Sequence, residues 1–87
     1  MKSMEESQVK IRESHSQNLN CKVYIYENKK EEYFVISIPD LFWSIEVDYD
    51  LYGESLIEHL YLHLFNVLDE DEANELANRI SQWTSEL

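Results

Sequence analysis

The hydrophobic pattern of the chain changes its period near residue 53, and this change restricts the fold more than any other feature. Before this point apolar and polar residues alternate, most clearly over residues 43–49, which predicts strands. After it apolar residues recur at every third or fourth position, which predicts helices. This order predicts an α+β fold: a three-stranded, or four-stranded, antiparallel meander followed by two helices packed on one sheet face.

Three strands are predicted from runs rich in β-branched and aromatic residues, at 21–27, 33–38 and 42–49. The charged segment 28–32 joins the first two as a hairpin turn. Pro39 ends the second strand, because proline has no N–H group to donate to a ladder. The alternation in the third strand predicts a sheet with one covered face and one solvated, acidic face.

The N-terminal part of the chain, residues 1–20, is polar, and the single α+β domain is predicted to occupy residues 21–87. Within the polar part, residues 9–12 alternate and suggest a short edge strand. Residues 14–18 have the composition of a loop or a frayed tail. Partial disorder is expected before about residue 8.

Helices are predicted at residues 53–68 and 70–85, the first with a wide apolar stripe. Asp69, with Glu72 three residues later, resembles the capping box that begins many helices. The predicted core joins residues of both helices to the third strand. Its members are Leu60, Leu64, Leu76, Ile80, Trp83, Ile45 and Val47.

The charge is strongly negative, with 18 acidic and 7 basic residues and a formal net charge of −11. From Glu31 onward the only basic residue is Arg79. Binding to nucleic acid needs clustered lysine and arginine, so direct nucleic-acid binding is not expected, nor is attraction to an anionic membrane. The predicted partner is instead a protein with a basic surface.

The chain has one cysteine, Cys21, and therefore no internal disulfide. Its first residues lack the apolar segment of a secretory signal, and no apolar run approaches the ~20 residues that cross a bilayer. These features predict a cytoplasmic protein. Cys21 is interpreted as a small apolar strand residue and not as a reactive thiol.

Short motifs at residues 26–32, at Pro39 and Asp40, at Trp43 and Ser44, and at residues 77–83 resemble the YueH-like family of small proteins from Bacillus and Staphylococcus relatives. The resemblance spans about residues 21–85. It implies a bacterial, cytosolic origin. It carries over no catalytic residue and no assigned activity.

His59 and His63 lie four residues apart on the first predicted helix, a spacing at which both rings can reach one metal ion. The metalloprotease motif would require glutamate at position 60, where Leu60 stands. With a single glycine the chain has no phosphate-cradling loop. No enzymatic activity, metal or cofactor is therefore predicted, and a small metal-dependent enzyme using His59 and His63 stays a second alternative.

Leu62 lies away from the apolar stripe, and Phe42 falls on the less apolar face of its predicted strand. These two residues are candidates for a contact surface, with Glu46, Asp48 and Glu58 as charges at its rim. The predicted function is a non-enzymatic protein-binding module that docks on a basic surface. A nucleic-acid mimic, in which carboxylates imitate phosphates, is the first alternative, and homo-oligomer formation stays open.

Overall fold

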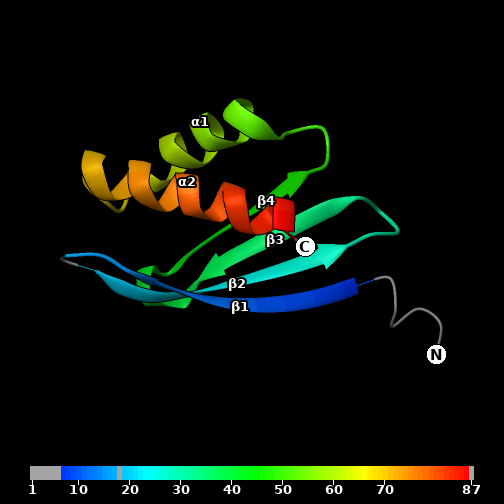
Figure 1. Ribbon diagram of the computed structural model, residues 1–87, viewed down its shortest axis with the longest axis horizontal. Coiled ribbons are helices and arrows are strands. Elements are labelled where there is room, and N and C mark those ends of the chain that lie inside the picture. The colour runs from blue at the N-terminus through cyan, green and yellow to red at the C-terminus, as the bar shows by residue number, and fades with distance from the viewer. Residues whose placement is uncertain (1–6, 18, 87) are drawn as a thin grey trace. The chain divides into compact units, whose positions relative to one another are not determined.

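The computed structural model describes residues 7–17 and 19–86, and the chain falls into two compact units (Figure 1). The sheet unit contains the described residues up to His15 and residues 20–50. The helical unit contains residues 51–86 and the short segment that begins at Ser16. The predicted α+β fold is confirmed: four antiparallel strands precede two helices.

The four strands pair in sequential order as an antiparallel meander. They are β1 (Ser7–His15), β2 (Asn20–Asn28), β3 (Tyr33–Ile38) and β4 (Trp43–Asp48). The alternating segment 9–12 is thus part of a full nine-residue strand. A loop was wrongly expected at Ser14 and His15, which instead pair with β2 as Ser14 opposite Cys21 and His15 opposite Asn20. The disorder predicted before residue 8 falls mostly on residues 1–6, which lie outside the described residues.

The two faces of the sheet differ in burial, as the alternation predicts. We call the buried side the inner face and the opposite side the outer face. On β4, the outer-facing Ser44, Glu46 and Asp48 are exposed, whereas Val47 on the inner face is buried. The buried residues of the inner face are Ser14, Cys21, Val23, Ile25, Glu27, Ile36, Ile38 and Val47.

A short 3-10 helix, η2 (Pro39–Leu41), connects β3 to β4. In the β2–β3 register Pro39 falls opposite Lys22, where the ladder would need an N–H that proline lacks. The Asp40 carboxylate instead accepts the Lys22 N–H at 3.2 Å. Phe42 ends this turn in a left-handed conformation with φ of 52°, so the strand begins at Trp43 and the prediction that placed Phe42 within it is wrong.

The helical unit consists of α1 (Gly53–Leu64) and α2 (Glu70–Glu86), which pack against each other. The buried residues are Leu56, Leu60 and Leu64 of α1 and Ala73, Leu76, Ala77 and Ile80 of α2. None of the helices in the described residues combines the length and apolar content needed to cross a bilayer.

The predicted core is confirmed in most of its members but not in all. Leu60, Leu64, Leu76, Ile80 and Val47 are buried. Trp83 and Ile45 are only partly buried, contrary to the prediction. The placement of the helices on one sheet face stays a prediction.

The first helix ends four residues earlier than predicted. The N–H groups of Val67 and Leu68 both bond to the Leu64 carbonyl oxygen at 2.9 Å, which closes the last turn. Apolar residues continue after this point, but they no longer follow a helical stripe. Phe65 and Val67 are consequently exposed.

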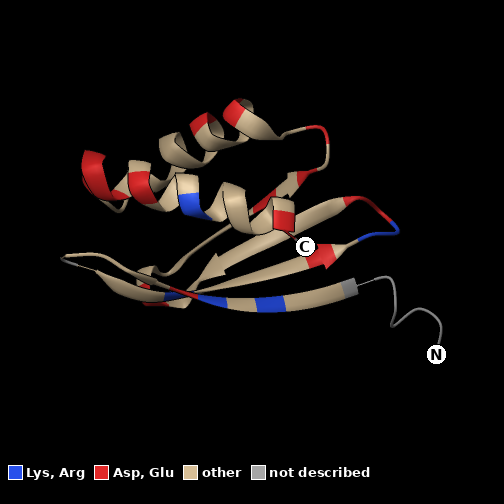
Figure 2. Cartoon of the chain, viewed as in Figure 1, with Lys and Arg blue, Asp and Glu red and all other residues tan. Residues whose placement is uncertain are grey.

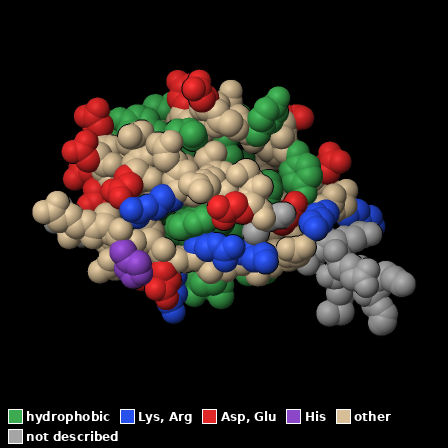
Figure 3. Space-filling view, viewed as in Figure 1, with side chains coloured by type: hydrophobic (Ala, Val, Ile, Leu, Met, Phe, Trp, Pro, Cys, Tyr) green, Lys and Arg blue, Asp and Glu red, His purple; other side chains and the backbone are tan. Residues whose placement is uncertain are grey.

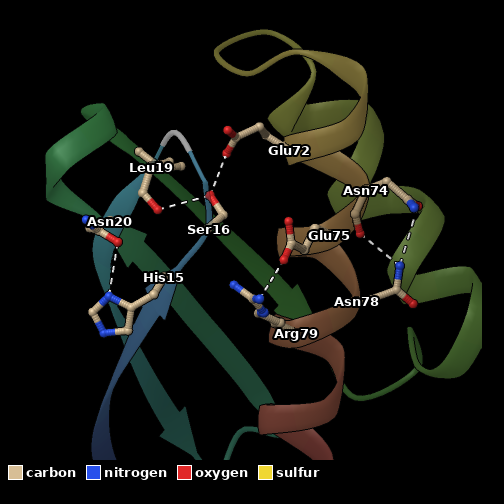
Figure 4. Close-up of polar contacts among 9 residues, drawn as sticks. All are labelled: His15, Ser16, Leu19, Asn20, Glu72, Asn74, Glu75, Asn78 and Arg79. Carbon is tan, nitrogen blue, oxygen red and sulfur yellow. Dashed lines mark hydrogen bonds and ion pairs between the residues drawn. The ribbon is translucent and has the colours of Figure 1, made fainter.

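The start of α2 forms half of the predicted capping box. The Asp69 Oδ1 atom accepts the Glu72 N–H at 2.9 Å, which satisfies one of the unpaired donors of the first turn. The Glu72 side chain does not return to Asp69, and its Oε1 atom lies 3.0 Å from the Ser16 hydroxyl (Figure 4). That hydroxyl also lies 3.0 Å from the Leu19 carbonyl oxygen.

Candidate docking surface

The outer face of the sheet carries a row of apolar side chains that crosses β1, β2 and β3. Val9 pairs with Tyr26, Tyr26 pairs with Val35, and Val35 pairs with Glu46. Side chains directly opposite each other on one face of an antiparallel pair are in reach of one another. The row is therefore continuous from β1 to an acidic residue on β4.

A second row runs beside the first, from Ile11 through Tyr24 to Ser37 and Ser44. Val9 and Ile11 are 60% and 53% exposed, which is unusual for aliphatic side chains that lie side by side. The tyrosines and Val35 are partly exposed. We call this group the outer patch: Val9, Ile11, Tyr24, Tyr26 and Val35.

Next to the outer patch, a third row contains Asn28, Tyr33 and Asp48. The Tyr26 and Tyr33 rings lie 6.1 Å apart, centroid to centroid. The Asn28 amide donates to the hydroxyl oxygens of Tyr26 and Tyr33, at 3.3 and 3.4 Å. These contacts restrain the Tyr26 side chain within the outer patch.

The β4 side of the outer face is acidic. Glu46 and Asp48 are both exposed there, next to Val35 and Tyr33 respectively. Neither carboxylate forms an ion pair within the part of the chain that the structure describes. We call Glu46 and Asp48 the acidic margin of the outer patch.

Charge is distributed differently in the two units (Figure 2). Among the described residues, the helical unit carries eight acidic residues and one basic residue, and the sheet unit carries eight acidic and five basic residues. Carboxylate side chains are spread over the view, whereas most of the lysine and arginine side chains lie over the strands (Figure 3). The single base of the helical unit, Arg79, forms an ion pair with Glu75 (Figure 4).

The candidate contact residues of the sequence fall into separate places. Phe42 is 97% exposed and lies in the turn before β4 rather than on the outer face. A bulky side chain in a left-handed backbone conformation is strained, at a cost of about 1–3 kcal/mol. Glu46 and Asp48 share the outer face, whereas Glu58 and Leu62 lie one turn apart on α1 in the helical unit.

Leu62 has exposed apolar neighbours that the helical stripe did not predict. Leu62, Phe65 and Val67 are 59%, 54% and 42% exposed, and the rings of Tyr61 and Phe65 stack at 5.8 Å. This second exposed group is smaller than the outer patch. It offers a comparison surface in the other unit.

The two histidines of α1 lie together, with ring centroids 4.6 Å apart. Throughout the described residues, no group of three or more histidine, cysteine, aspartate or glutamate side chains is placed to hold a metal ion. Cys21 is buried on the inner face.

One carboxylate, that of Glu27, is buried on the inner face. Its Oε2 atom accepts a short hydrogen bond from the Tyr49 hydroxyl, and within the described residues its Oε1 atom has no hydrogen-bond partner. Burial, followed by the hydrogen bond to Glu27 and the charges of Glu27 and Glu32, raises the pKa of Tyr49 to about 12. The phenol therefore stays protonated near neutral pH and acts as a donor, not as a base.

Comparison with known proteins places the chain in a family. The family model for the YueH-like protein matches residues 10–86. The chain belongs to the YueH-like family. The "Uncharacterized protein YueH" of Bacillus subtilis (strain 168) is 35% identical to it over 65 residues, which cover 75% of this chain and 79% of that protein. No solved structure matches the chain.

The YueH-like region is longer than the motifs indicated, because it begins at residue 10 and so includes most of β1. The outer patch of this YueH-like chain was not predicted from the sequence. The alternation in β2 places Tyr24 and Tyr26 on one side of their strand. Their proximity to Val9 and Ile11 depends on the β1–β2 register, which the alternation does not specify.

Proposed function

We propose that this YueH-like chain is a cytoplasmic, non-enzymatic protein-binding module that docks on the basic surface of a partner protein. The observation that carries the proposal is the outer patch of the sheet with its acidic margin, Glu46 and Asp48. A continuous, exposed apolar group is typical of an interaction site. The charge of −11 favours a basic partner.

The two parts of this surface would contribute in different ways. Aromatic and aliphatic side chains in the centre of an interface lose contact with water, and they supply most of the affinity. Tyr24 and Tyr26 occupy such a position in the outer patch. Charges at the rim act over a longer range, and they mainly raise the association rate. Glu46 and Asp48 lie at that rim.

The experiment compares two double variants as baits for capture from a Bacillus lysate. Val9→Thr with Ile11→Thr removes the most exposed apolar side chains of the outer patch and retains β-branching. Leu62→Gln with Val67→Thr is the matched control in the helical unit. We expect the first variant to lose about tenfold or more of the captured partner and the control to retain it.

Binding kinetics with the captured partner then test the acidic margin. Glu46→Lys with Asp48→Lys should slow association and flatten its dependence on ionic strength. The proposal fails if the control variant alone loses the partner, because the contact surface would then lie on the helical unit. An association rate that does not depend on salt would show that the acidic residues only keep the protein soluble.

A further inference from the structure

The strand β4 lies at one edge of the sheet, and one contact reveals which of its backbone groups point outward. The Tyr49 N–H donates to the Glu32 carbonyl oxygen at 3.0 Å, and these two residues continue the β3–β4 register. In an antiparallel pair, hydrogen-bonded and non-hydrogen-bonded residue pairs alternate. Residues 43, 45 and 47 therefore bond to β3, and Ser44, Glu46 and Asp48 direct their N–H and C=O groups away from it.

The same alternation holds across the rest of the sheet. The Ser16 N–H bonds to the Leu19 carbonyl oxygen at 2.8 Å, so even-numbered residues of β1 bond to odd-numbered residues of β2. The even-numbered Lys22 must then direct its N–H toward the β3 side. That N–H is the one accepted by Asp40, which confirms the assignment.

The Lys22 N–H and the outward-directed N–H groups of β4 differ in whether a side chain accepts them. Asp40 satisfies Lys22 where β3 has ended. Within the described residues, no side chain accepts the N–H groups of Ser44, Glu46 or Asp48, and their side chains are exposed. The outer edge of β4 is thus a row of backbone donors and acceptors to which another strand can pair.

We propose that the partner contributes an extended segment that adds to β4 as a fifth, antiparallel strand. The inference rests on the proposed function and specifies the chemistry of the partner. Residues of the added strand that bond to Glu46 and Asp48 would carry their side chains on the outer face, directly opposite the two carboxylates. The segment that fits has lysine or arginine at two alternate positions, with apolar residues between them that lie beside Ile45 and Val47 on the inner face.

The β1 edge suits this partner less well. Its outward-directed residues include Val9 and Ile11, which are apolar. Its two basic residues, Lys10 and Arg12, pair with Ile25 and Val23 and therefore lie on the inner face, and Glu13 is its one acidic residue. A basic segment added at β1 would have no acidic pair opposite it, whereas β4 supplies Glu46 and Asp48. Backbone pairing supplies affinity at a strand edge, and the alternate side chains supply specificity.

The test uses the full chain and two short synthetic peptides with blocked ends. In the first peptide lysine and valine alternate; the second has the same composition with its lysines contiguous. Amide hydrogen exchange is followed by NMR. In the free protein the amides of Ser44, Glu46 and Asp48 should exchange faster than those of Ile45 and Val47. The alternating peptide should slow the exchange of the first three by about tenfold or more, and the other peptide should not.

Charge reversal supplies the control. Glu46→Lys with Asp48→Lys should abolish the protection, and Glu31→Lys with Glu54→Lys, an equal change in charge at exposed positions elsewhere, should preserve it. Equal binding of both peptides without amide protection would overturn strand addition, since the attraction would then be non-specific. Failure of both peptides to bind would also overturn it, and the acidic residues would then serve to prevent edge pairing. The proposed docking function has a separate readout, because it depends on Val9 and Ile11 through partner capture.

Discussion

Leu64→Ala is the perturbation whose effect on stability can be worked out most directly. Leu64 is the last residue of α1, and its side chain is 0% exposed. Leu62→Ala is an unusually close control, because Leu62 lies on the same helix and is 59% exposed. Both substitutions replace leucine by alanine, so their effects on helix propensity largely cancel in the comparison.

The expected difference follows from burial. Full burial of a leucine side chain contributes about 1.5–3 kcal/mol, and the cavity left by truncation raises the loss to about 2–5 kcal/mol. Leu62→Ala should change the free energy of unfolding by no more than about 0.5 kcal/mol. For a chain of 87 residues, each kcal/mol corresponds to a fall in melting temperature of about 4–8 °C.

Urea denaturation of both variants, followed by far-UV circular dichroism, measures this difference. The midpoint should fall for Leu64→Ala at an unchanged slope, which indicates lower stability and not a changed denatured state. A loss below about 1 kcal/mol, or a loss equal to that of Leu62→Ala, would show that Leu64 does not belong to the core. The prediction of a packed helical core would then be wrong.

Three further predictions concern ionisation, capping and salt. Since folding raises the pKa of Tyr49 from 10.0 to about 12, its contribution to stability is complete below pH 10 and is lost as the pH rises through 12. Ultraviolet titration should show the Tyr49 phenol ionising at about pH 12, and Glu27→Gln should lower the pKa of Tyr49; an unchanged titration would refute the role of Glu27. Asp69→Ala removes the cap of α2 and should cost about 0.5–2 kcal/mol in urea denaturation, whereas the exposed Asp71 should tolerate alanine with a smaller loss. Because like charges repel in the native state, the melting temperature should rise from low salt to about 0.15 M, and a fall would contradict this.

The sequence was sufficient to predict those helices and strands whose hydrophobic periodicity is complete within their own segment. The strands at 21–27 and 33–38 and the two helices follow from local periodicity, and the change of period falls at Gly53, whose φ of +61° suits a residue without Cβ. The length of β1 could not be predicted in this way. Its polar end is held by pairing with β2, and such tertiary pairing overrides local propensity.

The candidate surface was only partly predictable for the same reason. Glu46 and Asp48 could be recognised because the alternation of β4 is complete within one strand. The outer patch combines residues of three strands, and its continuity exists only in one register. The outward direction of the β4 backbone groups depends on which residue pairs exchange hydrogen bonds, a property that side-chain patterns do not encode.

The distribution of charge along β1 also bears on whether two copies of the chain can pair through that edge. Odd-numbered residues of β1 direct their backbone groups outward, so antiparallel pairing with a second β1 would set odd residues opposite odd residues and even residues opposite even residues. Lys10 would then face Lys10 or Arg12 of the other copy in the central registers. Like charges directly opposite each other destabilise a strand pair, and charged side chains that point inward are a known protection of sheet edges. Self-association through β1 is therefore disfavoured.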